Sequence, residues 1–220
     1  MSKILLYFIF STSFLAYEHP LLIQRTALLY QKEKANLKNY KSNLETITIV
    51  KDNTGKMVEK RIQQNYFNSP SEYIFVTKEI EVNGNKQLLN KDIIERTSKV
   101  ELDWLSKEGL DFHQFQLIRK DSNIEIFLVQ PQIIKQNIYR GQIWIDSSSN
   151  KIIKIIKEPI LKKKDISRYT IELKFEKVFQ VQLPSYTKLV ANYLSPNGNT
   201  EIEIEVNYKS YQINTTPFKE

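Results

Sequence analysis

Few residues in this chain have the chemistry that catalysis or metal binding requires. The sequence contains two histidines, His19 and His113, and no cysteine. A cysteine nucleophile is therefore excluded, and a zinc site built on three histidines cannot form. Asp103, Glu108 and Asp111 stand close to His113 in the sequence. They could bind a metal or act as acid and base, although acids that flank a helix end are usually solvated.

Known catalytic motifs are missing from the sequence. It has no G-x-S-x-G, no glycine-rich phosphate loop and no H-E-x-x-H. His113 stands between Phe112 and Phe115, a setting that favours a packed histidine over a general base. We therefore predict no enzymatic activity and no cofactor. A hydrolase that uses His113 stays open as an alternative.

Charge is spread along the chain rather than gathered. Lysines and glutamates interleave along most predicted strands, which is typical of solvated sheet faces, and no basic stripe carries interleaved aromatic residues. Nucleic acid is therefore not an expected partner. Lys162, Lys163 and Lys164 form a basic block, which is either a solvated loop tip or a contact with the anionic headgroups of a membrane surface.

The first residues have the pattern of a secretory signal. Lys3 precedes an apolar run, Ile4 to Ala16, that ends in small residues and is too short to span a bilayer. We expect residues 1–16 to be removed after export, with cleavage after Ser13 or Ala16. The remaining residues, 17–220, are expected to form one domain, located in a periplasm. Without cysteine, neither a lipid anchor on a thiol nor a disulfide is possible.

The stretch 139–146, YRGQIWID, alternates with the two-residue period of a strand that is covered on one face. Ile143 and Ile145 lie on the covered face. Residues 147–150 are polar and suit a turn, and residues 151–157 carry four isoleucines before Pro159. An antiparallel hairpin is expected here, and we take it as the centre of the protein.

Two helices are expected beside the strands. Residues 20–38 place leucines at roughly helical spacing after Pro20, with one buried stripe. Residues 92–107 could begin with a capping box formed by Asp92 and Glu95, and carry Ile94 and Trp104 near one stripe. Such a stripe usually packs against a sheet, and less often forms part of a ligand gate. Ile94 and Trp104 are therefore lid candidates.

The remaining segments alternate as strands, each with one apolar and one charged face. Twelve tyrosines and eleven phenylalanines also favour β-structure. A sheet with many amphipathic strands must curve over something apolar, and the two helices are available to cover it. The expected fold is α+β, a curved antiparallel sheet covered by an N-terminal and a mid-chain helix. The residues expected on its apolar concave face are Ile47, Ile49, Ile143, Ile145, Tyr169, Ile171, Leu173, Phe175, Ile202, Ile204 and Val206.

The order of several motifs resembles a known family. G-x-I-W-I-D is followed by K-I-I-K, then by Leu183-Pro184 and late hairpins, with Asn83, Gly84 and Leu88 after the third strand and Tyr208 and Tyr211 at the close. This order is similar to the LolA/LolB-type superfamily of periplasmic lipoprotein-sorting proteins, over most of residues 20–212. The resemblance implies an incomplete antiparallel barrel closed by helices, with an apolar cavity that holds lipoprotein acyl chains.

These observations predict a monomeric periplasmic carrier or chaperone that encloses a lipid or the acyl chains of a lipoprotein. Transient contact with a membrane surface or a membrane partner would accompany that role. The alternative is a non-enzymatic interaction or envelope sensor module on the same sheet, with its cavity filled by its own Phe and Tyr side chains.

Overall fold

The computed structural model describes residues 19–69, 72–98, 103–135, 138–161, 164–195 and 198–214. The proposed signal segment lies outside these residues. The helices are α1 (Leu21–Ala35) and α2 (Lys107–Phe112). The first strands are β1 (Asn39–Asp52), β2 (Gly55–Asn68), β3 (Glu72–Val82), β4 (Asn85–Gln87), β5 (Ile93–Ser98) and β6 (His113–Asp121). The later strands are β7 (Ile124–Pro131), β8 (Tyr139–Asp146), β9 (Lys151–Pro159), β10 (Ile166–Val178), β11 (Val181–Ser195) and β12 (Gly198–Ile213).

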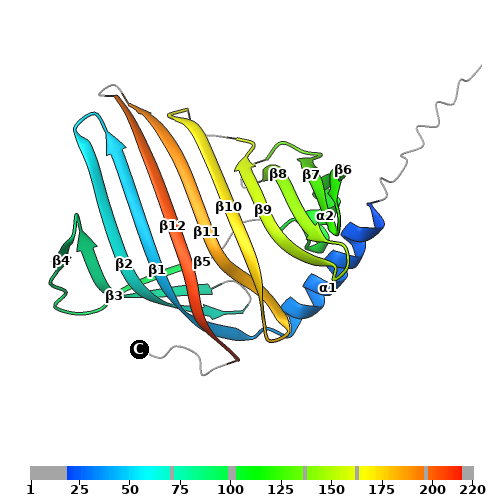
Figure 1. Ribbon diagram of the computed structural model, residues 1–220, viewed down its shortest axis with the longest axis horizontal. Coiled ribbons are helices and arrows are strands. Elements are labelled where there is room, and N and C mark those ends of the chain that lie inside the picture. The colour runs from blue at the N-terminus through cyan, green and yellow to red at the C-terminus, as the bar shows by residue number, and fades with distance from the viewer. Residues whose placement is uncertain are drawn as a thin grey trace, which may run out of the picture.

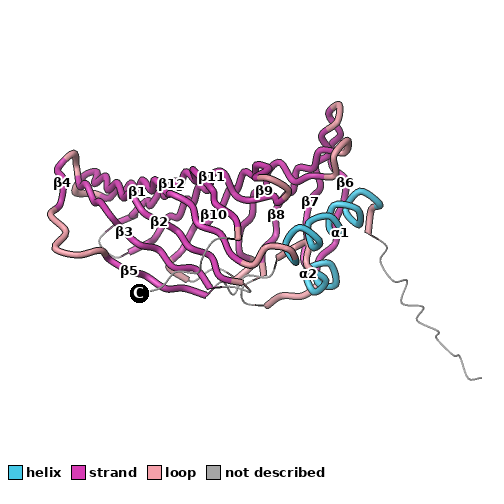
Figure 2. Tube along the Cα trace, turned by 90° about the horizontal axis from the view of Figure 1, so that it is seen from below, coloured by secondary structure: helices cyan, strands magenta, loops and turns pink. Residues whose placement is uncertain are grey.

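All twelve strands belong to one antiparallel sheet, in the order β4-β3-β2-β1-β12-β11-β10-β9-β8-β7-β6, with β5 paired to β3. Neighbours in the chain are neighbours in the sheet, with three exceptions: β5 pairs with β3 rather than β4, β6 begins the opposite edge, and β12 returns to pair with β1. The sheet is open, and Figure 2 shows it curving toward the side on which both helices lie. The expected α+β class with a curved antiparallel sheet is confirmed. The β8–β9 hairpin also forms as expected, but it lies toward the β6 end of the sheet, and β12 and β11 occupy the centre (Figure 1).

Helix α1 packs on the concave side of the sheet through a narrow face. Pro20 stands directly before its first residue, where a missing backbone N–H costs nothing. Ile23, Thr26 and Ala27 are its buried residues in the first two turns, spaced three and four apart. The predicted leucine stripe is wrong in part, since Leu21 and Leu28 are 59% and 69% exposed. The small Ala27 side chain lets the helix approach the sheet closely, which the leucines would not allow.

The mid-chain helix predicted over residues 92–107 is wrong. Residues Ile93 to Ser98 instead form β5 along β3, because Ile93, Ile94 and Thr97 are β-branched and β3 offers an unpaired edge. The proposed capping residues make other contacts: Asp92 pairs with Lys78, and Glu95 with Arg61.

The observed helix α2 begins later and is short. Ser106 caps it, and its Oγ accepts a hydrogen bond from the Gly109 amide at 2.9 Å. Gly109 lies inside this helix. A Cβ atom there would meet the Asp103 carbonyl oxygen at 1.9 Å, so only glycine fits.

The main core lies between α1 and the β6–β9 part of the sheet. Its buried residues come from α1, from the segment just before α2 and from the inner face of the strands. They are Ile23, Ala27, Trp104, Leu105, Phe115, Phe127, Val129, Ile143, Ile145 and Ile152. A second cluster, Leu37, Tyr40, Val181 and Leu183, joins the start of β1 to β11. Both clusters therefore lie on the concave side, and they leave the middle of the sheet between them.

Candidate functional site

The strand register assembles two continuous rows of side chains on the concave face. Residues directly opposite each other on paired strands share a face. The first row crosses seven strands through Thr46, Val206, Thr187, Leu173, Ile155, Ile143 and Phe127. The second crosses seven strands through Thr48, Ile204, Leu189, Ile171, Lys157, Gly141 and Val129.

A third, shorter row adds to this face. It runs through Val50, Ile202, Ala191 and Tyr169. Tyr169, Ile171 and Leu173 thus share a face with Ile202, Ile204 and Val206, as the alternation in both segments predicted. Phe175 packs against the main core, which places it on the same side.

Burial changes along the rows. Phe127, Val129 and Ile143 are fully buried under α1, whereas Val206, Ile204 and Leu189 are only half-buried. The helices lie at the β6–β9 end of the concave side, and Figure 2 shows no helix beneath β1, β12 and β11 in the described part of the chain. An apolar strip therefore leaves the sealed core and continues onto a surface that the described residues cover only partly. We call this strip the concave strip: Thr46, Thr48, Val50, Tyr169, Ile171, Leu173, Thr187, Leu189, Ile202, Ile204 and Val206.

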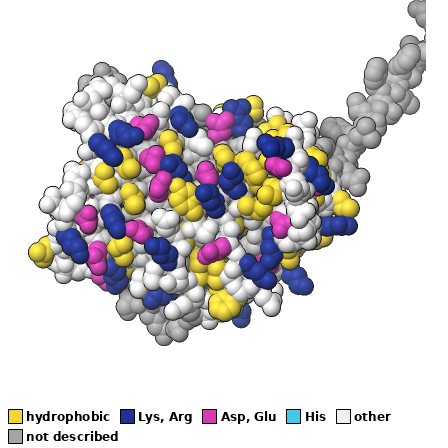
Figure 3. All heavy atoms as spheres, in the orientation of Figure 1, with side chains coloured by type: hydrophobic (Ala, Val, Ile, Leu, Met, Phe, Trp, Pro, Cys, Tyr) yellow, Lys and Arg dark blue, Asp and Glu magenta, His cyan; other side chains and the backbone are white. Residues whose placement is uncertain are grey.

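The opposite face of the same strands is charged. Lys188 Nζ lies 2.9 Å from Glu203 and 3.0 Å from Glu205, and these hydrogen bonds raise the pKa of Lys188. Lys60 and Lys209 both pair with Glu45. Figure 3 shows this face, with basic and acidic side chains interspersed among hydrophobic ones. It has the mixed charge of a solvated sheet surface.

Two residues expected on the concave face lie on the charged face instead. Ile47 stands opposite Glu205 and Ile49 opposite Glu203. The expectation failed because β1 turns Tyr40, Ser42 and Leu44 inward, and the same alternation puts the threonines that follow on that side. The threonines of β1, rather than its isoleucines, face the concave side.

The lid candidates do not form a lid together. Ile94 lies on β5 and is 44% exposed, whereas Trp104 is buried in the main core and its Nε1 donates to the Tyr139 carbonyl at 3.2 Å. Ile143 and Ile145 are also buried in that core, so their predicted ligand contact would require α1 to move. Of the basic block, Lys164 is exposed, and Lys162 and Lys163 lie outside the described residues.

One end of the concave face is polar. Arg61 stands opposite Thr46, and its Nε lies 2.7 Å from Glu59 and its Nη1 3.6 Å from Glu95. Within the second row, Lys157 Nζ lies 4.7 Å from the Tyr139 ring centroid. These charges were not predicted from the sequence. The polar residues at alternate positions 59, 61 and 63 of β2 were a signal that one face of this strand is not apolar.

His113 is held by the backbone. Its Nδ1 lies 2.8 Å from the Gly109 carbonyl oxygen, and its Nε2 lies 3.1 Å from that of Tyr139. The ring is fully buried, and burial lowers its pKa, although the hydrogen bonds to both carbonyls act in the opposite direction. With both ring nitrogens engaged, His113 is placed as a structural residue between α2 and β8.

Asp103 does not join His113 in a site either. Its carboxylate accepts from Tyr30 Oη at 2.9 Å and pairs with Lys34 at 2.5 Å. Burial raises the pKa of Asp103, but the charge of Lys34 and these hydrogen bonds outweigh it and lower the pKa. Asp103 therefore anchors α1. Among the described residues no group of three or more His, Cys, Asp or Glu side chains could hold a metal ion.

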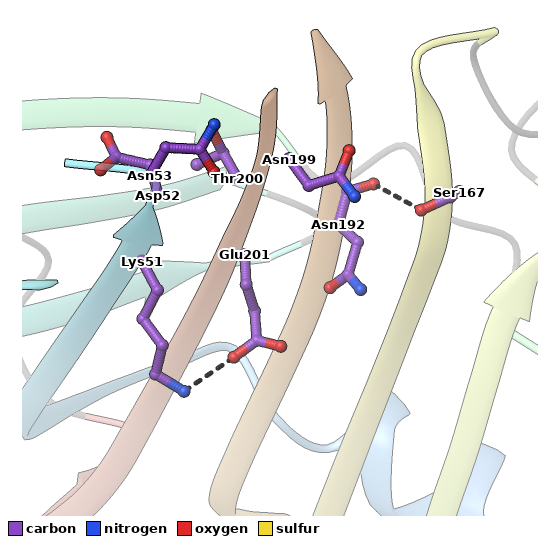
Figure 4. Close-up of a pocket in the computed structure, with 8 residues that line it drawn as sticks. All are labelled: Lys51, Asp52, Asn53, Ser167, Asn192, Asn199, Thr200 and Glu201. Carbon is purple, nitrogen blue, oxygen red and sulfur yellow. Dashed lines mark hydrogen bonds and ion pairs between the residues drawn. The ribbon is translucent and has the colours of Figure 1, made fainter. Parts of the chain in front are cut away.

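A polar pocket of about 430 Å³ lies at the hairpin ends of the charged face (Figure 4). It is lined by Lys51, Asp52, Asn53, Ser167, Asn192, Asn199, Thr200 and Glu201. Lys51 and Glu201 neutralise each other at 2.8 Å, and Ser167 Oγ donates to the Asn192 carbonyl at 3.3 Å. Asp52 accepts from the Thr54 and Gly55 amides, and the buried Asn192 Oδ1 has no hydrogen-bond partner among the described residues.

No protein-family model matches this chain, and no curated protein matches it. Among solved structures it is similar to a LolA superfamily protein from Nitrosomonas europaea, with 10% identity and a TM-score of 0.47 over 89% of this chain and 94% of that one. It is also similar to a putative outer membrane lipoprotein-sorting protein domain from Vibrio parahaemolyticus, with 12% identity and a TM-score of 0.45 over 90% and 95% of the chains.

A DUF1329 family protein from Desulfovibrio piger gives 10% identity and a TM-score of 0.43, over 91% of this chain and 96% of that one. The superfamily that the sequence resembles is thus found among the structures to which this chain is similar. No helix among the described residues is long and apolar enough to cross a membrane.

Proposed function

We propose that this protein is a periplasmic carrier that holds the acyl chains of a lipid or lipoprotein on the concave strip. The observation that carries the proposal is the first row, which runs from Phe127 and Ile143 in the sealed core through Ile155 and Leu173 to the half-buried Val206 on β12. Lys157 interrupts the second row, but its members on β10, β11 and β12 are again apolar. A protein whose core were complete would have no reason to extend apolar side chains past its helical cover. Export would follow from the signal-like residues 1–16.

The dimensions of the strip suit an acyl chain. Strands in a sheet are spaced about 4.8 Å apart, so the strip, which crosses β10, β11, β12 and β1 over three spacings, is about 14 Å wide. Much of an extended fatty acyl chain can lie across this width. Burial of each methylene group contributes about 0.8 kcal/mol, so a long chain gains enough to be shielded from water in transit.

Capture of a fluorescent fatty acyl probe tests this function. Ile204→Gln should weaken binding about tenfold, because Ile204 lies in the middle of the strip and its apolar contact is worth about 1.5 kcal/mol or more. Ile47→Gln is the matched control, since it makes the same change on the charged face of the neighbouring strand. It should bind the probe like the wild type.

Circular dichroism and urea unfolding must show that both variants fold. If the wild-type protein binds no probe across fatty acids, detergents and acylated peptides, the carrier function is wrong. The full burial of Phe127, Ile143 and Ile145 would then support the alternative of an interaction module with a filled core. Equal weakening by the two substitutions would place the binding site elsewhere.

A further inference from the structure

The two-residue turn between β10 and β11 presents an aromatic side chain to solvent. Phe179 is 75% exposed and has a φ of 55°. Glycine and asparagine are the residues that usually occupy a positive φ in a tight hairpin, because a side chain with a Cβ is strained there. Phe179 is therefore unfavourable in this turn for two reasons: its apolar ring is exposed to water, and its backbone has a strained positive φ. Neither is explained by packing within the described residues.

A pocket of about 610 Å³ lies beside this turn, at the C-terminal half of α1. Residues from α1, from the starts of β9 and β11 and from the end of β12 line it. Leu29, Phe179, Val181 and Ile213 supply apolar surface, and Val181 belongs to the second core cluster. The pocket thus opens where the concave side of the sheet reaches its edge.

Three lysines, Lys32, Lys151 and Lys177, line this pocket, and none of them forms an ion pair within the described part of the chain. On the charged face of the sheet, by contrast, Lys51, Lys60, Lys188 and Lys209 are all paired. The positive charge around the pocket is therefore not compensated by ion pairs among the described residues.

The nearby acids have other contacts. Glu33 is the acid that lines the pocket, but it is buried and its Oε2 accepts from the Gln182 amide at 2.8 Å. Asp146 stands opposite Lys151 in the register, and its carboxylate accepts from Ser148 and Ser149.

We propose that this end of the molecule docks on the surface of a membrane that contains anionic phospholipids. Phe179 enters the interfacial region, where an aromatic ring is favoured, and the three lysines contact lipid phosphates. The charge complementarity argues for this partner: ammonium groups on long flexible side chains suit a fluid array of phosphates, and a single projecting ring suits insertion. The site differs from the basic block, since Lys164 precedes β10 whereas Phe179 follows it, at the other end of that strand.

Sedimentation with vesicles tests the proposal on the full chain. Vesicles of phosphatidylcholine alone are compared with vesicles that also contain phosphatidylglycerol, at low and high salt. The wild type should bind the anionic vesicles more tightly, and salt should reduce the difference. Because residues 4–16 are apolar and common to all variants, the readout is the dependence on phosphatidylglycerol rather than total binding.

Phe179→Gly should reduce this binding about tenfold through loss of the inserted ring. It should also raise the melting temperature, because glycine relieves the positive φ, so misfolding cannot explain the loss. Changing Lys32, Lys151 and Lys177 together to Gln should reduce binding about a hundredfold, or about fivefold for each lysine.

Matched controls alter the same number of side chains elsewhere. Leu88→Ser removes a residue that is 94% exposed after β4, and a triple change of Lys51, Lys60 and Lys209 to Gln removes the same net charge from the other face. Both control variants should bind the anionic vesicles within about twofold of the wild type if the site is local.

Equal binding of the wild type to both kinds of vesicle would overturn the proposal, as would equal loss of binding in the two triple variants. Binding that is unchanged by Phe179→Gly and by the pocket lysine changes would assign this surface to a protein partner instead.

Discussion

His113 illustrates how burial turns a reactive residue type into a structural one. Its ring is fully buried, and the Trp104 ring centroid lies 6.1 Å away. Both ring nitrogens face backbone carbonyl oxygens. Burial lowers the pKa of His113 below its ordinary value of 6.5, whereas the hydrogen bonds to the two carbonyls raise it to a smaller extent. The sequence predicted the packed state correctly from the flanking phenylalanines, but it could not show which carbonyls would hold the ring.

The lowered pKa of His113 predicts a loss of stability in acid. The unfolded chain binds a proton near pH 6.5, and the folded protein binds it only at lower pH. Between those two values the unfolded state holds more protons, so the free energy of unfolding should fall as the pH falls. Urea unfolding from pH 7.5 to 5 should show a shallower decrease in His113→Gln than in the wild type. Subtracting the two curves cancels the contributions of His19 and the carboxylates, and parallel curves would contradict the prediction.

At the scale of elements, the β8–β9 hairpin depends on one glycine. Gly141 has a φ of +159°, and a Cβ atom there would lie 2.0 Å from the Ile156 carbonyl oxygen and 2.8 Å from the Lys157 Cα. Both atoms belong to the backbone of the paired strand and cannot move aside. Gly141→Ala should therefore lower the free energy of unfolding by about 2 to 4 kcal/mol.

Gly84→Ala is the control for this prediction. Gly84 also has a positive φ, of +82°, but nothing lies within 4 Å of the site of its Cβ. Its substitution should cost only about 1 kcal/mol, the strain of the backbone alone. Urea denaturation of both variants measures the difference, and equal losses would mean that the close approach of β9 is unimportant.

The elements that the sequence predicted well are those with local signals. Alternating patterns and a polar turn located the β8–β9 hairpin, and alternation located the strands β10 and β12. The segment 92–107 was mistaken because its pattern allows a helix, and the edge of β3, which converts Ile93–Ser98 into a strand, is a contact distant in sequence. The inward face of β1 was inverted for a related reason: alternation defines two faces but does not say which one the sheet buries.

For the molecule as a whole, the sheet has unequal ends. The β6–β9 end is sealed by α1, which Tyr30, Gln31 and Lys34 fasten to residues 103–105. The middle strands carry the concave strip with partial cover. The sequence predicted the apolar strip on β10 and β12 through the side-chain period of two. It could not predict that Ile143 and Ile145 would be sealed, because that depends on where α1 docks.

The difference in cover between the β6–β9 end and the middle strands predicts a difference in hydrogen exchange. Backbone amides in β7 and β8 should be the best protected in the free protein, since they lie beneath the main core, and those of β1, β10, β11 and β12 should exchange faster. If acyl chains bind the concave strip, an acylated ligand should slow exchange in these four strands and leave β7 and β8 almost unchanged. Mass spectrometry of the protein with and without the ligand measures this difference in exchange.

Ile204→Gln should abolish the slowing at the same ligand concentration, whereas Ile47→Gln should retain it. Slowing confined to β7 and β8 would instead mean that the ligand displaces α1 and enters the main core, and the strip would then not be the binding site.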